Sequence, residues 1–213
     1  MTTLPGNTRR AYWLKTLHEW HWISSAICLL GLLLYAITGI TLNHSEQIDT
    51  PPKIENFSGD VPAALLAQLA ALGAAAEEKQ YVPATPPELQ AWASRTFHVD
   101  LGRASAEWSA REIYLSMQRP GGDAWLSISL RSGGARYQTT QRGWIAYFND
   151  LHKGRYTGTA WTWFSDIIAA GCLMFAITGL FILKLHALNR PLTWPLVGLG
   201  ILVPLLLAIL FIH

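Results

Sequence analysis

Charged side chains are scarce in this chain of 213 residues: only 14% are Asp, Glu, Lys or Arg, whereas 51% are hydrophobic. Cysteine is scarcer, with Cys28 and Cys172 alone, which we expect to be small packing residues. Neither lies in a Cys-x-x-Cys-His run, so covalent attachment of a c-type haem is excluded. No nicotinamide or flavin fingerprint is present. The composition points to a membrane protein, and we expect no nucleic acid partner.

Three apolar stretches are long enough to cross a bilayer: Ile23–Leu42, Trp161–Leu183 and Leu192–Ile212. Each holds roughly 20 residues, and at about 1.5 Å per residue such a helix spans the roughly 30 Å hydrocarbon core. Backbone groups in lipid must be hydrogen-bonded internally, so we predict three transmembrane helices in contact with the lipid bilayer. The third contains Pro195 and Pro204, and its Leu-rich surface would face lipid or a second copy of the chain.

Positive charges near these stretches predict the orientation of the chain. They are Arg9, Arg10 and Lys15 before the first stretch, and Lys184 and Arg190 between the second and third. The positive-inside rule places both groups in the cytoplasm, so the N-terminus would be inside and the C-terminus outside. The first stretch is too long for a signal peptide, and we interpret it as an uncleaved anchor. The expected divisions are residues 1–44, an outer domain at 45–158, residues 159–190 and residues 191–213.

The outer segment is long enough for one modest hydrophobic core. Val61–Glu78 is rich in Ala and Leu, and Glu88–Phe97 follows two prolines, so both are predicted helices. Ile113–Met117 and Ala124–Leu130 have the pattern of strands, and a third short strand is expected near Tyr137. We therefore predict a small α+β domain with a three-stranded meander between the first and second transmembrane helices.

A five-residue repeat lies inside the first two apolar stretches: Ala36-Ile37-Thr38-Gly39-Ile40 recurs as Ala176-Ile177-Thr178-Gly179-Leu180. The two stretches would run antiparallel, so a pseudo-two-fold axis in the membrane plane would relate them. Histidines lie near both ends of each stretch. These are His18, His21 and His44 for the first, and His152 and His186 for the second. Each membrane face would then present one histidine from each helix.

Two imidazoles that face each other across packed helices suit a six-coordinate b-type haem, whose iron alternates between ferric and ferrous without losing a ligand. Gly39 and Gly179 would let the helices approach closely or make room for a flat macrocycle, although ordinary helix packing is an alternative. Single histidines at helix ends also serve as interfacial anchors, but the symmetric placement favours ligands. We expect one or two haem b groups, with axial ligands among His44, His152, His186 and either His18 or His21.

His18 and His21 are alternative ligands at the inner face. On an ideal helix His44 is offset by about 80° from His18 and about 140° from His21, which favours His18 slightly. The 23 to 26 residues between the inner and outer histidines of the first helix correspond to about 35 to 39 Å, too far for one efficient tunnelling step. A two-haem relay would need inward-leaning macrocycles or aromatic stepping stones such as Tyr35 and Phe175.

Asp166 is a carboxylate inside the second apolar stretch, where such a group is costly and usually faces a protein partner. It could accept a hydrogen bond from a ligand imidazole and so help to bind the cofactor. It could also pair with Arg155 or cap its helix. His98 is expected to be a surface residue of the outer domain.

Several of these sequences together resemble the PepSY-associated transmembrane helix family, and the resemblance covers nearly the whole chain. It rests on Leu17-His18-x-Trp20-His21-Trp22, Thr38-Gly39, Leu42-Asn43-His44, Asp123-Ala-Trp-Leu-Ser-Ile, Leu151-His152-Lys153-Gly154-Arg155, Trp163, Asp166 and Thr178-Gly179. The resemblance implies a bacterial inner-membrane protein with a periplasmic PepSY-like domain. Some larger relatives are haem-containing reductases of ferric siderophores, so it also implies a ferric siderophore as a candidate partner.

Two functional classes follow. In the first, the protein is a haem-dependent oxidoreductase that moves electrons from an unknown cytoplasmic donor, bound from outside the chain, to a periplasmic acceptor. In the second, the PepSY-like domain is a regulatory or peptidase-binding module and the helices only anchor it. The symmetric histidines favour the first, because an anchor does not need them. A copper or zinc site is a weaker alternative, since no histidine pair has the tight ligand spacing that those ions usually use.

Overall fold

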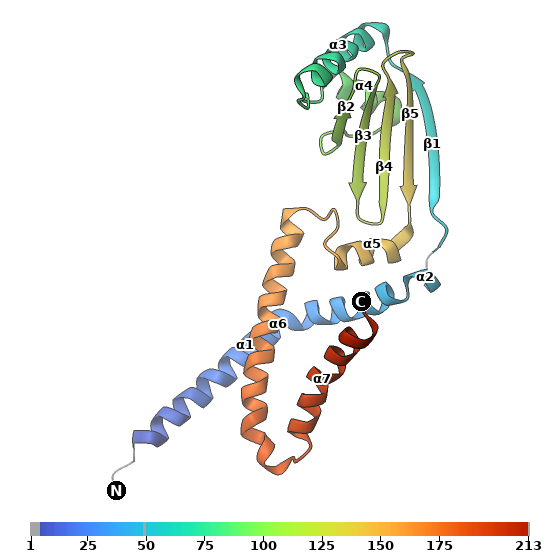
Figure 1. Cartoon of the computed structure of the whole chain (residues 1–213). Coiled ribbons are helices and arrows are strands. Elements are labelled where there is room, and N and C mark those ends of the chain that lie inside the picture. The colour runs from blue at the N-terminus through green and yellow to red at the C-terminus, as the bar shows by residue number, and fades with distance from the viewer. Residues whose placement is uncertain (1–4, 49, 213) are drawn as a thin grey trace. The chain divides into compact units, whose positions relative to one another are not determined.

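The computed structural model describes residues 5–48 and 50–212. Its three longest helices are α1 (Pro5–Asn43), α6 (Thr159–His186) and α7 (Thr193–Phe211), as shown in Figure 1. All three are long and apolar enough to cross a membrane. The prediction of three candidate transmembrane helices is therefore confirmed.

The chain divides into two compact units. One consists of α1 up to Tyr35, α6 from Trp163 onward and α7, which follows α6 after a short 3-10 turn at Ala187–Asn189. The other spans Ala36–Thr162. It contains the predicted outer domain together with the last two turns of α1.

A five-stranded antiparallel sheet dominates the second unit, with strand order β1-β5-β4-β3-β2. The strands are β1 (Lys53–Asp60), β2 (Ser105–Trp108), β3 (Glu112–Arg119), β4 (Gly122–Ser129) and β5 (Gly134–Gln141). The predicted meander forms the middle of the sheet, where Leu126 pairs with Leu115 on one side and Tyr137 on the other. The sheet is wider than predicted, because β1 and β2 add a strand at each edge.

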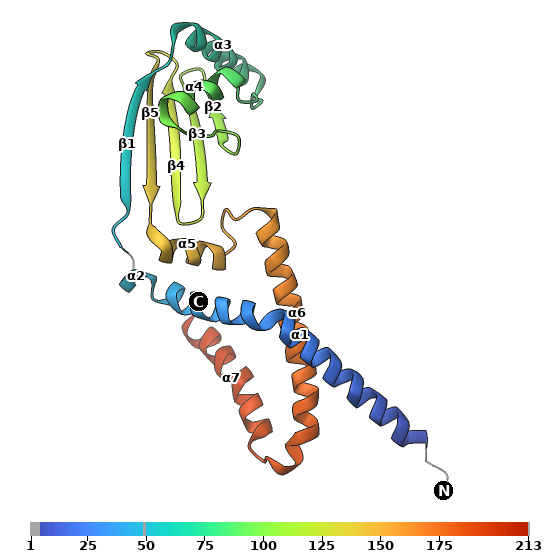
Figure 2. The same ribbon diagram turned by 180° about the vertical axis from the view of Figure 1, so that it is seen from behind.

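Helices α3 (Ala63–Lys79) and α4 (Pro87–Phe97) agree with the two predicted helices and pack on one face of the sheet, with α4 in front of the strands in Figure 2. In α3, Leu65 and Leu69 are four residues apart and both buried, as a single core-facing stripe requires. Leu115 and Leu126 are fully buried beneath them. Each such side chain contributes about 1.5–3 kcal/mol through burial, so this core holds the domain together.

Two further helices were not predicted. The short α2 (Ser45–Ile48) follows α1, and α5 (Gly143–His152) follows β5 directly. Helix α5 exposes Trp144 and Phe148, whereas Asn149 and Asp150 at its C-terminal end are buried. Its aromatic side is therefore open, and its polar end is enclosed by protein.

In the first unit, α1 and α6 pack antiparallel. His21 contacts Thr178, Cys28 lies beside Gly171, and each step toward the C-terminus of α1 is matched by a step back along α6. Further along, a Cβ added at Gly31 would lie 2.6 Å from Cγ2 of Ile168, inside van der Waals contact. Gly31 is thus required for close helix approach, as small residues commonly are between membrane helices.

The two cysteines provide a test of this pairing, because Cys28 on α1 lies beside Gly171, the residue before Cys172 on α6. We predict that mild oxidation of the protein in detergent links Cys28 to Cys172 within one chain. Replacing Gly31 with Leu should separate the helices and lower the yield of this disulfide severalfold. Mass spectrometry of proteolytic fragments measures the yield. Gly198→Leu is the matched control, since nothing lies within 4 Å of a Cβ added there, and equal yields in both variants would contradict the observed packing.

Candidate functional site

The first site lies where α1 meets α6. Nδ1 of His21 is 2.9 Å from Oγ1 of Thr178, which is buried. The Thr178 hydroxyl donates its own hydrogen to the backbone carbonyl of Met174, 2.7 Å away. Thr178 therefore accepts from His21, which places the imidazole proton on Nδ1 and the lone pair on Nε2.

Two neighbours fix the plane of the His21 ring. Phe175 stacks on it, with ring centroids 4.6 Å apart and an interplanar angle of 17°. On α6, a Cβ added at Gly179 would lie 3.4 Å from Cε1 of His21. The glycine thus leaves the imidazole room beside the helix backbone.

The second site repeats this arrangement within the other unit. Nδ1 of His152, the last residue of α5, is 2.8 Å from Oγ1 of the buried Thr38 near the end of α1. A Cβ added at Gly39 would again lie 3.4 Å from Cε1 of the histidine. Both copies of the Ala-Ile-Thr-Gly repeat therefore present a buried threonine and a glycine to a histidine from another element.

Buried polar contacts hold His152 in place. Asn149 lies about one helical turn before His152, and its Oδ1 accepts a hydrogen bond from the Thr41 hydroxyl at 2.9 Å. The neighbouring Asp150 accepts the backbone N–H of Gly121 through Oδ2, also at 2.9 Å. These contacts tie α5 to the end of α1 and to the turn between β3 and β4, so the sheet supports the histidine.

The other three predicted ligand histidines are exposed and bonded locally. Nδ1 of His18 donates to the Leu14 carbonyl and Nδ1 of His186 to the Ile182 carbonyl, each at 2.8 Å. Nδ1 of His44 lies 3.1 Å from Oε1 of Gln47. Carbonyl oxygens only accept hydrogen bonds, so in these residues too the lone pair is on Nε2. Ideal helix geometry slightly favoured His18 over His21 as the ligand at the inner face. In the structure, however, His21 is the one that contacts α6.

Asp166 is exposed on α6, seven residues after Thr159, and is too far into the helix to cap its first turn. His98 is exposed just after α4, as predicted, in a left-handed backbone conformation with φ of 55°. In the described part of the chain, no three His, Cys, Asp or Glu side chains cluster as a metal site would require. A bis-imidazole haem needs only two protein ligands.

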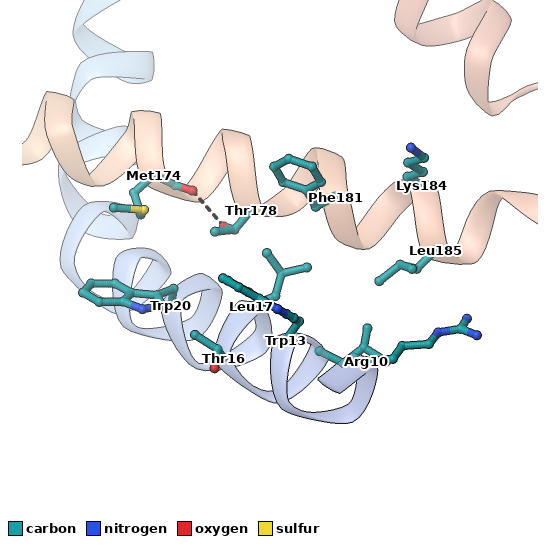
Figure 3. A pocket seen from close by; sticks show the side chains of 11 residues that line it. Arg10, Trp13, Thr16, Leu17, Trp20, Met174, Thr178, Phe181, Lys184 and Leu185 are labelled. Atoms are coloured by element: carbon teal, nitrogen blue, oxygen red, sulfur yellow. Dashed lines mark hydrogen bonds between the residues drawn. The ribbon is translucent and has the colours of Figure 1, made fainter. Parts of the chain in front are cut away.

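Each unit also contains a cavity. In the first, a pocket of about 700 Å³ lies between the N-terminal half of α1 and the C-terminal half of α6, and Figure 3 shows its lining side chains. In the second, a polar pocket of about 640 Å³ lies beside β2, β3 and the loop before α6. Its lining includes Arg103, Ser105, Ser116, Gln118, Tyr156 and Thr157. Sequence reasoning identified neither cavity, because both depend on packing between distant segments.

Three apolar helices and an α+β domain define an integral membrane protein in which two buried threonines hold histidines. A family model described as Putative PepSY_TM-like matches residues 12–213, so the chain belongs to this family. This match confirms the resemblance to PepSY-associated transmembrane proteins. No curated protein and no solved structure matches the chain significantly.

The tautomer of His21 can be tested by replacing its acceptor. Thr178→Val keeps the shape of the side chain but removes the hydroxyl, and a hydrogen bond is worth about 1 kcal/mol. We predict that the share of the Nδ1–H tautomer of His21 falls, with the tautomer ratio changing roughly fivefold. Nitrogen-15 NMR of labelled histidine side chains measures the ratio. Thr162→Val, which removes an exposed hydroxyl on the same helix, should leave the ratio unchanged, and an unchanged ratio in Thr178→Val would refute the assignment.

Proposed function

We propose that this protein is a transmembrane b-type haem protein that moves electrons from a cytoplasmic donor to an acceptor on the outer side, as a ferric reductase does. The observation that carries the proposal is the pair of equivalent sites, His21 with Thr178-Gly179 and His152 with Thr38-Gly39. A helix that serves only as an anchor has no need of either arrangement.

The fixed tautomer of His21 suits a haem ligand. Metal-ligating histidines usually donate their other ring N–H to a fixed acceptor, which sets the tautomer and makes the ligand more basic. Thr178 is such an acceptor for His21, so Nε2 is the nitrogen available for iron. When bound between two imidazoles, a b-type haem takes up and releases one electron without a change of ligands.

We propose that each haem is held by two histidines, one of which is hydrogen-bonded to a buried threonine. His21 and His186 would hold a haem at the inner face, and His152 and His44 one at the outer face. We choose His21 over His18 because the described hydrogen bond of His21 is to Thr178 on α6, whereas that of His18 is to the Leu14 carbonyl on its own helix. Asp166, exposed on α6, remains a candidate to accept a hydrogen bond from a ligand imidazole.

Aromatic side chains lie near the expected electron path. Phe175 stacks on His21, and the hydroxyl of Tyr35 is 2.6 Å from Oγ of Ser165. On α1, 17 residues separate His21 from Thr38, the partner of His152, compared with 23 between His21 and His44. The outer site is thus nearer to His21 along the chain by this route, and Tyr35 and Phe175 would serve as stepping stones.

We further propose that the sheet domain is periplasmic and that the protein resides in the bacterial inner membrane. The basic flanks support this orientation through the positive-inside rule. Thr38 and Thr41 belong to the apolar part of α1 and bond to His152 and Asn149, so α5 would lie at the membrane boundary. The exposed Trp144 of α5 suits that position, because tryptophan is enriched at headgroup level.

The polar cavity of the sheet domain is the best candidate for the acceptor site. Hydroxyl and amide groups from Ser105, Ser116 and Gln118 line it together with the guanidinium of Arg103. Such a lining suits an oxygen-rich anionic iron chelate of the siderophore class. Tyr156 brings the cavity within four residues of His152 along the chain. One electron delivered there would convert ferric to ferrous iron.

The haem assignment predicts distinct results for neighbouring histidines. Purified protein from haem-sufficient cells should show a Soret band that shifts on reduction with dithionite, with one or two haems per chain by the pyridine haemochrome method. His21→Ala and His152→Ala should each remove one haem or abolish binding, because the iron loses an axial ligand. His98→Ala is the matched control and should leave the spectrum intact.

The remaining histidines refine the same measurement. His44→Ala and His186→Ala should convert the corresponding haem from six-coordinate to five-coordinate or release it, whereas His18→Ala should change little. A protein that stays colourless when haem is supplied would refute the function and leave an anchored PepSY-like module.

The acceptor cavity is tested by the reoxidation rate of the reduced protein. Arg103→Gln removes one exposed positive charge, worth up to about 1 kcal/mol in a polar contact. Reoxidation by ferric citrate, which is anionic, should therefore slow about two- to fivefold, whereas a neutral ferric chelate should react at nearly the original rate. Stopped-flow absorbance of the haem measures both rates. Arg111→Gln, an exposed arginine outside the cavity lining, should have no such effect, and equal slowing in both variants would exclude a specific role for Arg103.

A further inference from the structure

We propose that the pocket between α1 and α6 binds one anionic phospholipid from the leaflet next to the N-terminal half of α1. The pocket measures about 700 Å³ and lies wholly within the unit formed by these helices. Thr178, the partner of His21, also lines this pocket, so lipid and haem would be alternative occupants of the same space. The proposal of a lipid depends on the shape and charge of the pocket.

The walls of the pocket are apolar along most of its length. Trp13, Leu17 and Trp20 line it from α1, and Met174 and Phe181 line it from α6. The α1 residues recur every three or four positions, so they form one continuous stripe along the helix. Such a stripe suits an extended acyl chain, which gains about 0.8 kcal/mol for each methylene that it buries.

Both cations of the pocket lie at one end. Figure 3 shows Arg10 and Lys184 at that end, and Trp20 and Met174 at the other. Among the described residues that line the pocket, none is acidic. The two cations thus have no carboxylate within the pocket itself, and they are placed to bind an anion that enters with the ligand.

The position of this charged end selects a lipid as the source of the anion. Lys184 lies in the last turn of α6, where a membrane-spanning helix meets the headgroup layer. Basic pockets between transmembrane helices on the cytoplasmic side commonly bind anionic headgroups, and each cation near the surface is worth about 1 kcal/mol. A free phosphate would satisfy the cations but would leave the apolar walls unfilled.

The experiment measures the phospholipid retained by the full chain after purification in mild detergent, by mass spectrometry of the intact complex and of extracted lipid. We expect about one phosphatidylglycerol or cardiolipin per chain and little phosphatidylcholine after exchange into mixed lipid. Arg10→Gln with Lys184→Gln should reduce retention roughly tenfold or more, because both headgroup contacts are lost. Lys15→Gln with Lys153→Gln is the matched control: it removes two exposed positive charges outside the pocket lining and should retain the lipid.

Further measurements separate the alternatives. Millimolar inorganic phosphate should not displace the lipid, and displacement would show that the cations form a simple anion site and overturn the proposal. Equal retention of phosphatidylcholine, or a haem bound in the pocket in place of lipid, would also overturn it. Oxidative linking of Cys28 to Cys172 in the Arg10 and Lys184 variant checks that the helix pair is intact. Loss of lipid with the link preserved supports the proposal, and retention of lipid in that variant refutes it.

Discussion

A polar group within a membrane helix pair must find its partner inside the protein, and this constraint explains the arrangement around His21. Its Nδ1–H is satisfied by Thr178, and the Thr178 hydroxyl is satisfied in turn by the carbonyl of Met174. An imidazole left without a partner there would cost about 1–3 kcal/mol. The same chain of bonds orients the ring and directs its lone pair, so the requirement for stability also determines which nitrogen can bind a ligand.

The elements that could be predicted from sequence are those with a strong local pattern. The three long apolar stretches are recognised by length and hydropathy. The helices packed on the sheet bury a regular stripe, and the strands of the central meander alternate faces. Strand β1 was missed because it is an edge strand whose side chains are mostly exposed, which removes the alternation. Strand β2 has only four residues. Helix α5 begins two residues after β5 ends, so the sequence has no loop-like segment between them to mark the start of a new element.

The sequence singled out the histidines and the Thr-Gly repeat but could not indicate which residues meet. The contact of His21 with Thr178 depends on the antiparallel alignment of α1 with α6, and that of His152 with Thr38 on the packing of α5 against the end of α1. No local pattern encodes either alignment. Helix periodicity relative to His44 favoured His18. The structure instead turns His21 toward α6, because His21 is in phase with Ser24, Cys28 and Gly31, the buried side of α1. Burial against the neighbouring helix therefore decided between two residues that spacing alone left nearly equivalent.

The two sites reach the same geometry by different routes. His21 lies within a long transmembrane helix, whereas His152 ends a short helix that the sheet domain supports. Both nevertheless place Nδ1 within 3 Å of a threonine that is 5% exposed, beside a glycine. Close packing alone would be served by any small residue, such as alanine or glycine. A hydroxyl at both positions is explained by the need to fix an imidazole, which supports the proposal that the repeat serves ligand binding.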